Sequence, residues 1–170
     1  MSNLVLELRS GEMMIVNGAP IRFRTKTRIE LTAKARFLFG KQILPPDQVD
    51  SPARRIYFAL QTAYIGAEEE RAGGLDAARE LIPAFKAATT SHLAREILDR
   101  ALIAAEMDDC YQALKLARRI IRHEDAVLGR EPDLPRMPSA GMTETAPPRD
   151  VVSAPSQPLP KRELSSPCLP

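Results

Sequence analysis

ILPPDQVDSPARRIYFAL, residues 43–60, divides this sequence into two parts that favour different kinds of structure. Pro45 and Pro46 end a region of β-type patterning, because proline cannot donate a ladder hydrogen bond inside a sheet. Ser51 and Pro52 then favour a helix start, since serine caps free N–H groups and proline tolerates the first helical position. Strands followed by helices predict an α+β fold.

Before this boundary the sequence predicts an antiparallel β-meander. Asn17 and Gly18 tolerate positive φ and suit a tight hairpin turn between the second and third strands. Residues 25–27 should form the next turn, so that the fourth strand pairs with the third. Alternating or β-prone residues place the strands at 3–9, 12–16, 21–24 and 28–32, with 33–41 as a fifth strand or a helix start.

After the boundary the sequence predicts a bundle of three to four helices. We expect Gly73 and Gly74 to form a turn before the second helix, and Pro83 to kink or divide that helix. The helices should cover residues 51–65, 75–90 and 91–107, followed by one that Asp108 and Asp109 cap and that ends by 128–129. We therefore interpret residues 1–44 as a basic meander and residues 45–130 as a helical half packed with it as one domain.

The last segment, residues 131–170, has a different composition. It holds ten of the fifteen prolines, with serine and threonine between them. Such a segment buries too little apolar surface to offset its chain entropy. We expect a disordered Pro/Ser-rich tail.

Composition excludes several classes of function. Charged Glu7 and Arg9 stand where a secretory signal needs an apolar stretch, and no apolar run approaches the roughly 20 residues of a membrane span. Cys110 and Cys168 form no Cys-x-x-Cys pair and have no histidine cluster beside them. We expect a cytoplasmic protein that is not an enzyme, with no metal, no cofactor, no small-molecule substrate and no membrane contact.

Positive charge gathers in the first third of the chain. Residues 1–60 carry ten Lys/Arg against five Asp/Glu, and residues 20–41 carry seven basic groups and one acid. A ribbon of cations can follow a phosphate backbone, but a solvated outer sheet face has the same pattern. The candidate RNA-binding residues are Arg22, Arg24, Lys26, Arg28, Lys34 and Arg36.

The helix that begins at Ser51 supplies a second group of candidates. Arg54 and Arg55 lie in its first turn, where cations oppose the helix dipole unless a carboxylate or phosphate pairs with them. Tyr57 and Tyr64 belong to large apolar side chains that surround more than half of this helix. This pattern indicates a helix buried on both sides, or one that docks a partner. We interpret these four residues as partner or RNA contacts.

A third basic group lies near the end of the helical half. Lys115, Arg118, Arg119 and Arg122 have the spacing of one helix face. They either extend a nucleic-acid surface or complement the negative end of the helix dipole.

The block SPARRIYFALQ, residues 51–61, closely resembles the most distinctive segment of the FlbT family. Shorter similarities lie at residues 11–12, 15–19 and 111–115, and together they cover residues 4–128 in the expected order. The resemblance implies a post-transcriptional repressor in bacterial flagellum biogenesis. Such a protein associates with the 5′ untranslated region of flagellin mRNA, promotes mRNA degradation and works with the flagellar partner protein FlaF.

An alternative function belongs to another class. The protein would be an interaction adaptor, or a chaperone for flagellin or its export apparatus, with only an indirect effect on RNA. The sign of regulation and the oligomeric state do not follow from the sequence.

Overall fold

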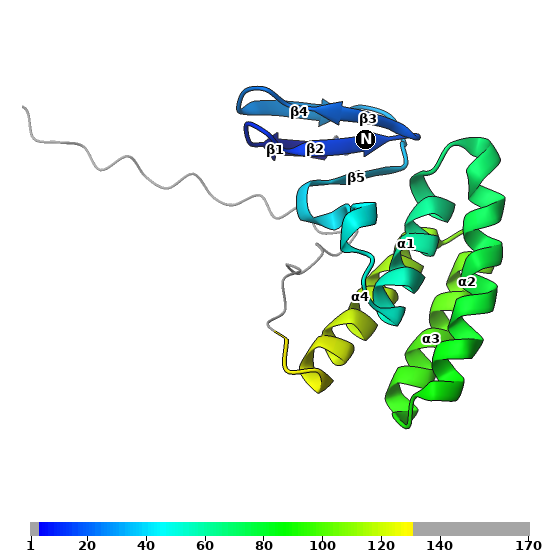
Figure 1. The fold of residues 1–170 in the computed structure, drawn as a ribbon. Coiled ribbons are helices and arrows are strands. Elements are labelled where there is room, and N and C mark those ends of the chain that lie inside the picture. The colour runs from blue at the N-terminus through cyan, green and yellow to red at the C-terminus, as the bar shows by residue number, and fades with distance from the viewer. Residues whose placement is uncertain (1–3, 131–170) are drawn as a thin grey trace, which may run out of the picture. The chain divides into compact units, whose positions relative to one another are not determined.

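The computed structural model describes residues 4–130, and the predicted tail lies outside them. An N-terminal region of antiparallel strands is followed by four helices (Figure 1), which confirms the α+β class. The elements are β1 (Leu4–Leu8), β2 (Met13–Val16), β3 (Ala19–Arg22), β4 (Thr27–Leu31), β5 (Phe37–Phe39), the 3-10 turns η1 (Gly40–Gln42) and η2 (Pro46–Gln48), α1 (Pro52–Ile65), α2 (Glu68–Ala88), α3 (His92–Glu106) and α4 (Cys110–Val127).

Strands β1 to β4 form one long hairpin with a single register. Leu8 lies opposite Thr27 in the β1–β4 pair, and Met13 lies opposite Arg22 in the β2–β3 pair, so partner numbers add to 35 in both halves. The predicted turn at residues 17–18 is confirmed, with both residues at positive φ. Strand β5 adds to the other edge of β2.

The predicted pairing of the third and fourth strands is wrong, because β4 pairs with β1. The third strand stays with the second beyond Arg22. There, the Phe23 N–H donates to Glu12 O (3.0 Å), and Gly11 N–H donates to Phe23 O (2.7 Å). Residues 25–27 therefore do not reverse the chain.

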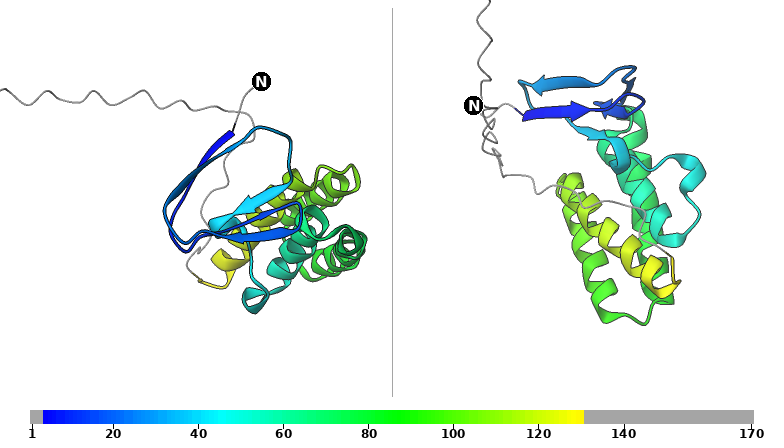
Figure 2. Two further views of the ribbon diagram at one scale, coloured as in Figure 1. Left: turned by 90° about the horizontal axis from the view of Figure 1, so that it is seen from above. Right: turned by 90° about the vertical axis from the view of Figure 1, so that its left-hand side faces the viewer.

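The hairpin bends in its middle, at residues 9–12 and the facing residues 23–26 (Figure 2). Gly11 adopts φ +86°, a backbone conformation that is energetically unfavourable for residues with a Cβ. The Glu12 N–H donates to Arg9 O (3.2 Å), while a carboxylate oxygen of Glu12 accepts from Arg9 N–H (2.8 Å). These bonds close a tight turn and redirect β1 away from β2.

Helices α1, α3 and α4 begin and end close to the predicted residues. Ser51, Ser91 and Asp109 cap them by accepting hydrogen bonds from backbone N–H groups in the first turn. The expected serine start of the first helix and aspartate start of the last are thus confirmed.

Helix α2 differs from the prediction because it runs through Gly73, Gly74 and Pro83 without a break. A Cβ added at Gly74 would lie 2.6 Å from Ala63 N and 2.8 Å from Ala59 O of α1. Gly74 is therefore a site of close helix packing and not a turn. Local helix propensity does not indicate this requirement for a small residue, because it arises from contact with another helix.

Helix α1 lies in the core of the helical half and is buried on most of its surface. Ile56, Tyr57 and Leu60 are at most 1% exposed. Gln61, also buried, accepts a hydrogen bond from Leu44 N–H (2.8 Å) and donates one to Leu44 O (3.0 Å). These bonds fix the segment between β5 and α1 along the helix.

The strands contribute to this core from one face only. Ile15 and Leu38, which lie opposite each other on β2 and β5, pack against the helical core. Leu8 and Met14 are also buried, but they lie outside that cluster. No helix among residues 4–130 has the length and apolar character needed to cross a membrane.

Candidate nucleic-acid interface

Five of the six predicted RNA-binding residues lie exposed on the bent hairpin and the loop that follows it. We call Arg22, Arg24, Lys26, Arg28 and Lys34 the basic bend. None of the ion pairs found among residues 4–130 involves these five side chains. Their charges are directed to solvent and available to an anionic ligand.

Hydrogen bonds hold the backbone of residues 23–27. Besides the two bonds of Phe23, Ser10 Oγ of the facing strand donates to Arg24 O (2.7 Å). Thr27 Oγ1 adds a local bond by donating to Thr25 O (3.0 Å). The cations therefore stand on a defined scaffold, which suits the positioning of a phosphate backbone.

Arg36, the sixth predicted RNA-binding residue, has a structural partner. Its Nη2 donates to both oxygens of Asp108, at 2.9 and 2.7 Å. Its backbone exchanges hydrogen bonds with Asn17, at 3.0 Å to the side chain and 2.8 Å from the N–H. Arg36 thus connects the hairpin turn to the α3–α4 junction and does not belong to the basic bend.

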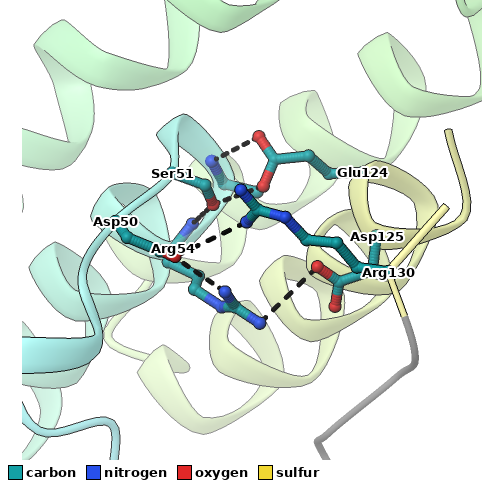
Figure 3. Close-up of polar contacts among 7 residues, drawn as sticks. Asp50, Ser51, Arg54, Glu124, Asp125 and Arg130 are labelled. Atoms are coloured by element: carbon teal, nitrogen blue, oxygen red, sulfur yellow. Dashed lines mark hydrogen bonds and ion pairs between the residues drawn. The ribbon is translucent and has the colours of Figure 1, made fainter. Parts of the chain in front are cut away.

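Arg54 lies in a group of charges at the junction of α1 and α4 (Figure 3). Its guanidinium lies 2.9 Å from Asp50 and 3.5 Å from Asp125, and Arg130 lies 3.5 Å from Asp50. We call these residues, with Ser51 and Glu124, the clasp. The partner that the sequence required for Arg54 is therefore a set of carboxylates, and this side chain is only 14% exposed.

Glu124 completes the clasp by capping α1 from another helix. One carboxylate oxygen accepts from Ser51 Oγ and the other from Ala53 N–H (3.2 Å). A carboxylate at a helix N-terminus interacts favourably with the positive end of the helix dipole. It therefore compensates for the adjacent cations, which are unfavourable at that end. The hydrogen bond from Arg54 also lowers the pKa of the Asp50 carboxyl below its ordinary value.

Tyr57 is part of the interior and not of a surface. It is 1% exposed, and its hydroxyl donates to Gln42 O at 2.6 Å. Burial raises the pKa of Tyr57 to about 12. Its role in this structure is to hold η1 on α1, which removes it from our candidate contacts.

Tyr64 and Arg55 remain accessible. Tyr64 is half-buried and packs against Tyr111, with ring centroids 5.8 Å apart. Arg55 is exposed and lines two neighbouring grooves, one between α1 and α2 and one that extends to the end of α4. Phe58, Leu81 and Phe85 supply much of their apolar lining.

The third basic group is split by the fold. Arg119 is exposed, and Lys115 lies 5.4 Å from the Tyr111 ring centroid, a cation–π contact. Arg118 is 2% exposed, and its Nε and Nη1 have no hydrogen-bond partner among residues 4–130. Burial lowers the pKa of the Arg118 guanidinium. These cations do not form one continuous surface.

Sequence reasoning missed the roles of Glu124, Asp125 and Gln61. One available signal was electrostatic: Glu124 and Asp125 stand near the negative end of α4, just as Arg54 stands near the positive end of α1. Acidic residues at the negative end of one helix and a basic residue at the positive end of another are each unfavourable alone. Their opposite charges indicate that the two helix ends meet. In the described part of the chain, no three His, Cys, Asp or Glu side chains are grouped to hold a metal ion.

Comparisons with known proteins agree on one family. A family model described as "Flagellar protein FlbT" matches residues 4–128. A probable flagellum biosynthesis repressor protein FlbT from Mesorhizobium japonicum is 32% identical over 145 residues, which are 81% of this chain and 92% of that protein. A protein of the same name from Brucella ovis is 32% identical over 133 residues, 75% and 83% of the two chains. No solved structure matches the chain.

Proposed function

Because the chain belongs to the FlbT family, we propose that it represses flagellum biosynthesis by binding the 5′ untranslated region of flagellin mRNA and promoting its degradation. The name of the relatives supports the repressor role. The basic bend supports the RNA contact, because its cations are exposed, close together in sequence and outside every ion pair found in residues 4–130.

The chemistry of the basic bend fits single-stranded RNA. Arg22, Arg24, Lys26 and Arg28 occupy every second position from the end of β3, through the bend, to β4, so their charges can follow successive phosphates. Phe37 and Phe39 are half-buried and stack on each other with centroids 6.4 Å apart, so base stacking is assigned to neither. Affinity in this proposal comes from phosphate neutralisation.

The protein supplies binding and no catalysis in this proposal. Cellular nucleases would cleave the bound leader. The flagellar partner protein FlaF would act together with the bound complex in the cytoplasm, through the accessible side chains of α1, Arg55 and Tyr64.

The test is binding of the full chain to a fluorescently labelled flagellin leader RNA across a salt series. If about five phosphates are neutralised, affinity should fall roughly a hundredfold between 50 and 200 mM salt. The series should be run with and without FlaF. Binding only in the presence of FlaF, or binding that salt does not weaken, would contradict a direct contact through the basic bend.

A charge-matched pair of variants locates the contact. Arg22→Ala combined with Arg24→Ala should weaken binding and make the logarithmic salt slope about 1.4 less steep. Arg79→Ala combined with Arg100→Ala removes the same charge from exposed helix surface and should change neither quantity. Equal losses in both variants would indicate general electrostatics and not a site.

The grooves beside α1 favour an adaptor as a second candidate function. They are apolar, lie at the surface and carry Arg55, for which no ion pair is found in the described chain. A partner helix with apolar anchors and one acidic residue fits this chemistry. Arg55→Glu should then weaken FlaF binding while leaving RNA binding by the protein alone unchanged.

A further inference from the structure

The β1–β4 half of the bent hairpin is a two-stranded arm with open edges. Within residues 4–130, β1 pairs only with β4, and β4 pairs only with β1. Each strand has five residues. An isolated pair of this size is marginally stable in water, and three or more strands are usually needed. The unpaired N–H and C=O groups of an outer edge can accept another strand.

Apolar side chains of this arm are also incompletely covered. Leu4 and Val5 are 45% and 41% exposed. Ile29 and Leu31, which lie opposite Leu6 and Leu4, are half-buried. Because the arm shows both open edges and apolar exposure, it has the properties of an interaction surface.

The residue order of β4, Thr27-Arg28-Ile29-Glu30-Leu31, is nearly symmetric in character about Ile29. We propose that this edge is an interface between two copies of the chain, in which the two β4 strands pair antiparallel about a twofold axis at Ile29. Arg28 then faces the partner's Glu30, and Glu30 faces the partner's Arg28. Cross-strand pairs of opposite charge stabilise a sheet, and like charges destabilise it.

The alternative edge lacks this complementarity. A twofold axis at Leu6 of β1 would place Glu7 opposite the partner's Val5, so no opposite charges would meet. Pairing through β4 instead gives a four-stranded sheet in the order β1-β4-β4-β1. It extends one apolar face across both copies. Of the basic bend, this pairing engages Arg28 and leaves Arg22, Arg24, Lys26 and Lys34 available to an anionic ligand.

The test is sedimentation equilibrium of the full chain without RNA, so its outcome is independent of the proposed RNA contact. The unmodified protein should be in monomer–dimer equilibrium. Arg28→Glu should place Glu against Glu at both symmetric positions, and Glu30→Arg should place Arg against Arg. Each variant should raise the dimer dissociation constant roughly tenfold or more.

Mixing the two variants provides the decisive measurement. Arg28→Glu and Glu30→Arg chains should form a mixed dimer, because opposite charges again meet at both positions. A fluorescent label on one variant would detect it by its sedimentation. The combined variant Arg28→Glu/Glu30→Arg should dimerise with itself, which separates loss of the interface from loss of folding.

Arg100→Glu is the matched control, since it reverses an exposed arginine on α3 and should leave the dissociation constant unchanged. A chain that stays monomeric at every concentration overturns the proposal. A dimer whose dissociation constant is the same in Arg28→Glu, Glu30→Arg and Arg100→Glu also overturns it. So does failure of the mixed pair to associate when circular dichroism shows that each variant is folded.

Discussion

Arginines at the clasp and arginines at the basic bend have opposite surroundings. Arg54 and Arg130 both lie within 3.5 Å of carboxylates, and Asp125 beside Arg54 is 1% exposed. Arg22 and Arg24 are exposed and take part in no ion pair found among residues 4–130. The same residue type therefore specifies how helices join in one region and leaves charge available in the other. Substitutions of arginine in the clasp and in the basic bend should therefore have different effects on the unfolding free energy.

The largest loss of stability is expected from Arg54→Ala. Removing this guanidinium leaves the buried Asp125 without its ion-pair partner, which costs about 3 kcal/mol of unfolding free energy. Urea unfolding followed by circular dichroism measures it. Arg55→Ala, in the same helical turn, should cost less than about 0.5 kcal/mol. Equal losses in the two variants would contradict the role of the clasp.

A smaller loss is expected from Gly74→Ala, which tests packing in the helical half without changing charge. The added methyl group would meet the α1 backbone at 2.6 and 2.8 Å, so α1 and α2 must separate at a cost of about 2 kcal/mol. Gly73→Ala makes the same change where nothing lies within 4 Å, and it should stabilise α2 by roughly 0.5–1 kcal/mol. Thermal unfolding of both variants would show the opposite signs.

Alkaline pH should weaken the helical half through Tyr57. The pKa of this side chain is about 12 in the folded protein, against 10.0 for an exposed tyrosine. Stability from the neutral hydroxyl is thus fully present below pH 10 and is lost as pH rises toward 12. At pH 11 the loss should be about 1 kcal/mol relative to pH 9.

Tyr57→Phe provides the control for this pH dependence. It removes the hydrogen bond to Gln42 O, so it lowers stability at pH 9, but it should also flatten the change between pH 9 and 11. Urea midpoints at the two pH values measure both effects. A variant as pH-sensitive as the original protein would assign the dependence to other groups.

The smallest effect on stability is expected in the basic bend. Arg22→Ala with Arg24→Ala should change the unfolding free energy by less than about 0.5 kcal/mol, because these exposed side chains take part in none of the ion pairs found in residues 4–130. The same urea experiment measures it. A loss comparable to that of Arg54→Ala would mean that the bend, too, holds the fold together.

Local chemistry made part of this fold predictable from sequence. The sequence predicted the helix cap at Ser51 and the turn at residues 17–18, because both depend on residues close in the chain. The alternation that exposes the basic residues of the hairpin is local in the same way. Gly74 was misread because its small size matters to α1 and not to its own helix. Similarly, the pairing of β4 with β1 depends on bonds between residues 11–12 and 23, which strand propensity does not encode.

The candidate site was predictable to the same extent. Alternation placed Arg22, Arg24, Lys26 and Arg28 on the surface, where the structure has them. Arg36 lies in an equally basic stretch of sequence, yet Asp108 reaches it from a distant part of the chain. Arg54 pairs with Asp50, four residues before it, and also with Asp125 from a distant helix. Only tertiary structure distinguishes an available arginine from an engaged one.

The single register of the hairpin also implies an order of folding. Partners at the turn, Val16 and Ala19, are three residues apart in the chain, whereas Leu4 and Leu31 are twenty-seven apart. Chain closure costs more entropy for longer separations, so pairing should begin at the turn and proceed residue by residue through the bend to Leu4 and Leu31. The β1–β4 segment then forms last and opens first, which makes its amide hydrogens the earliest in the sheet to exchange with solvent.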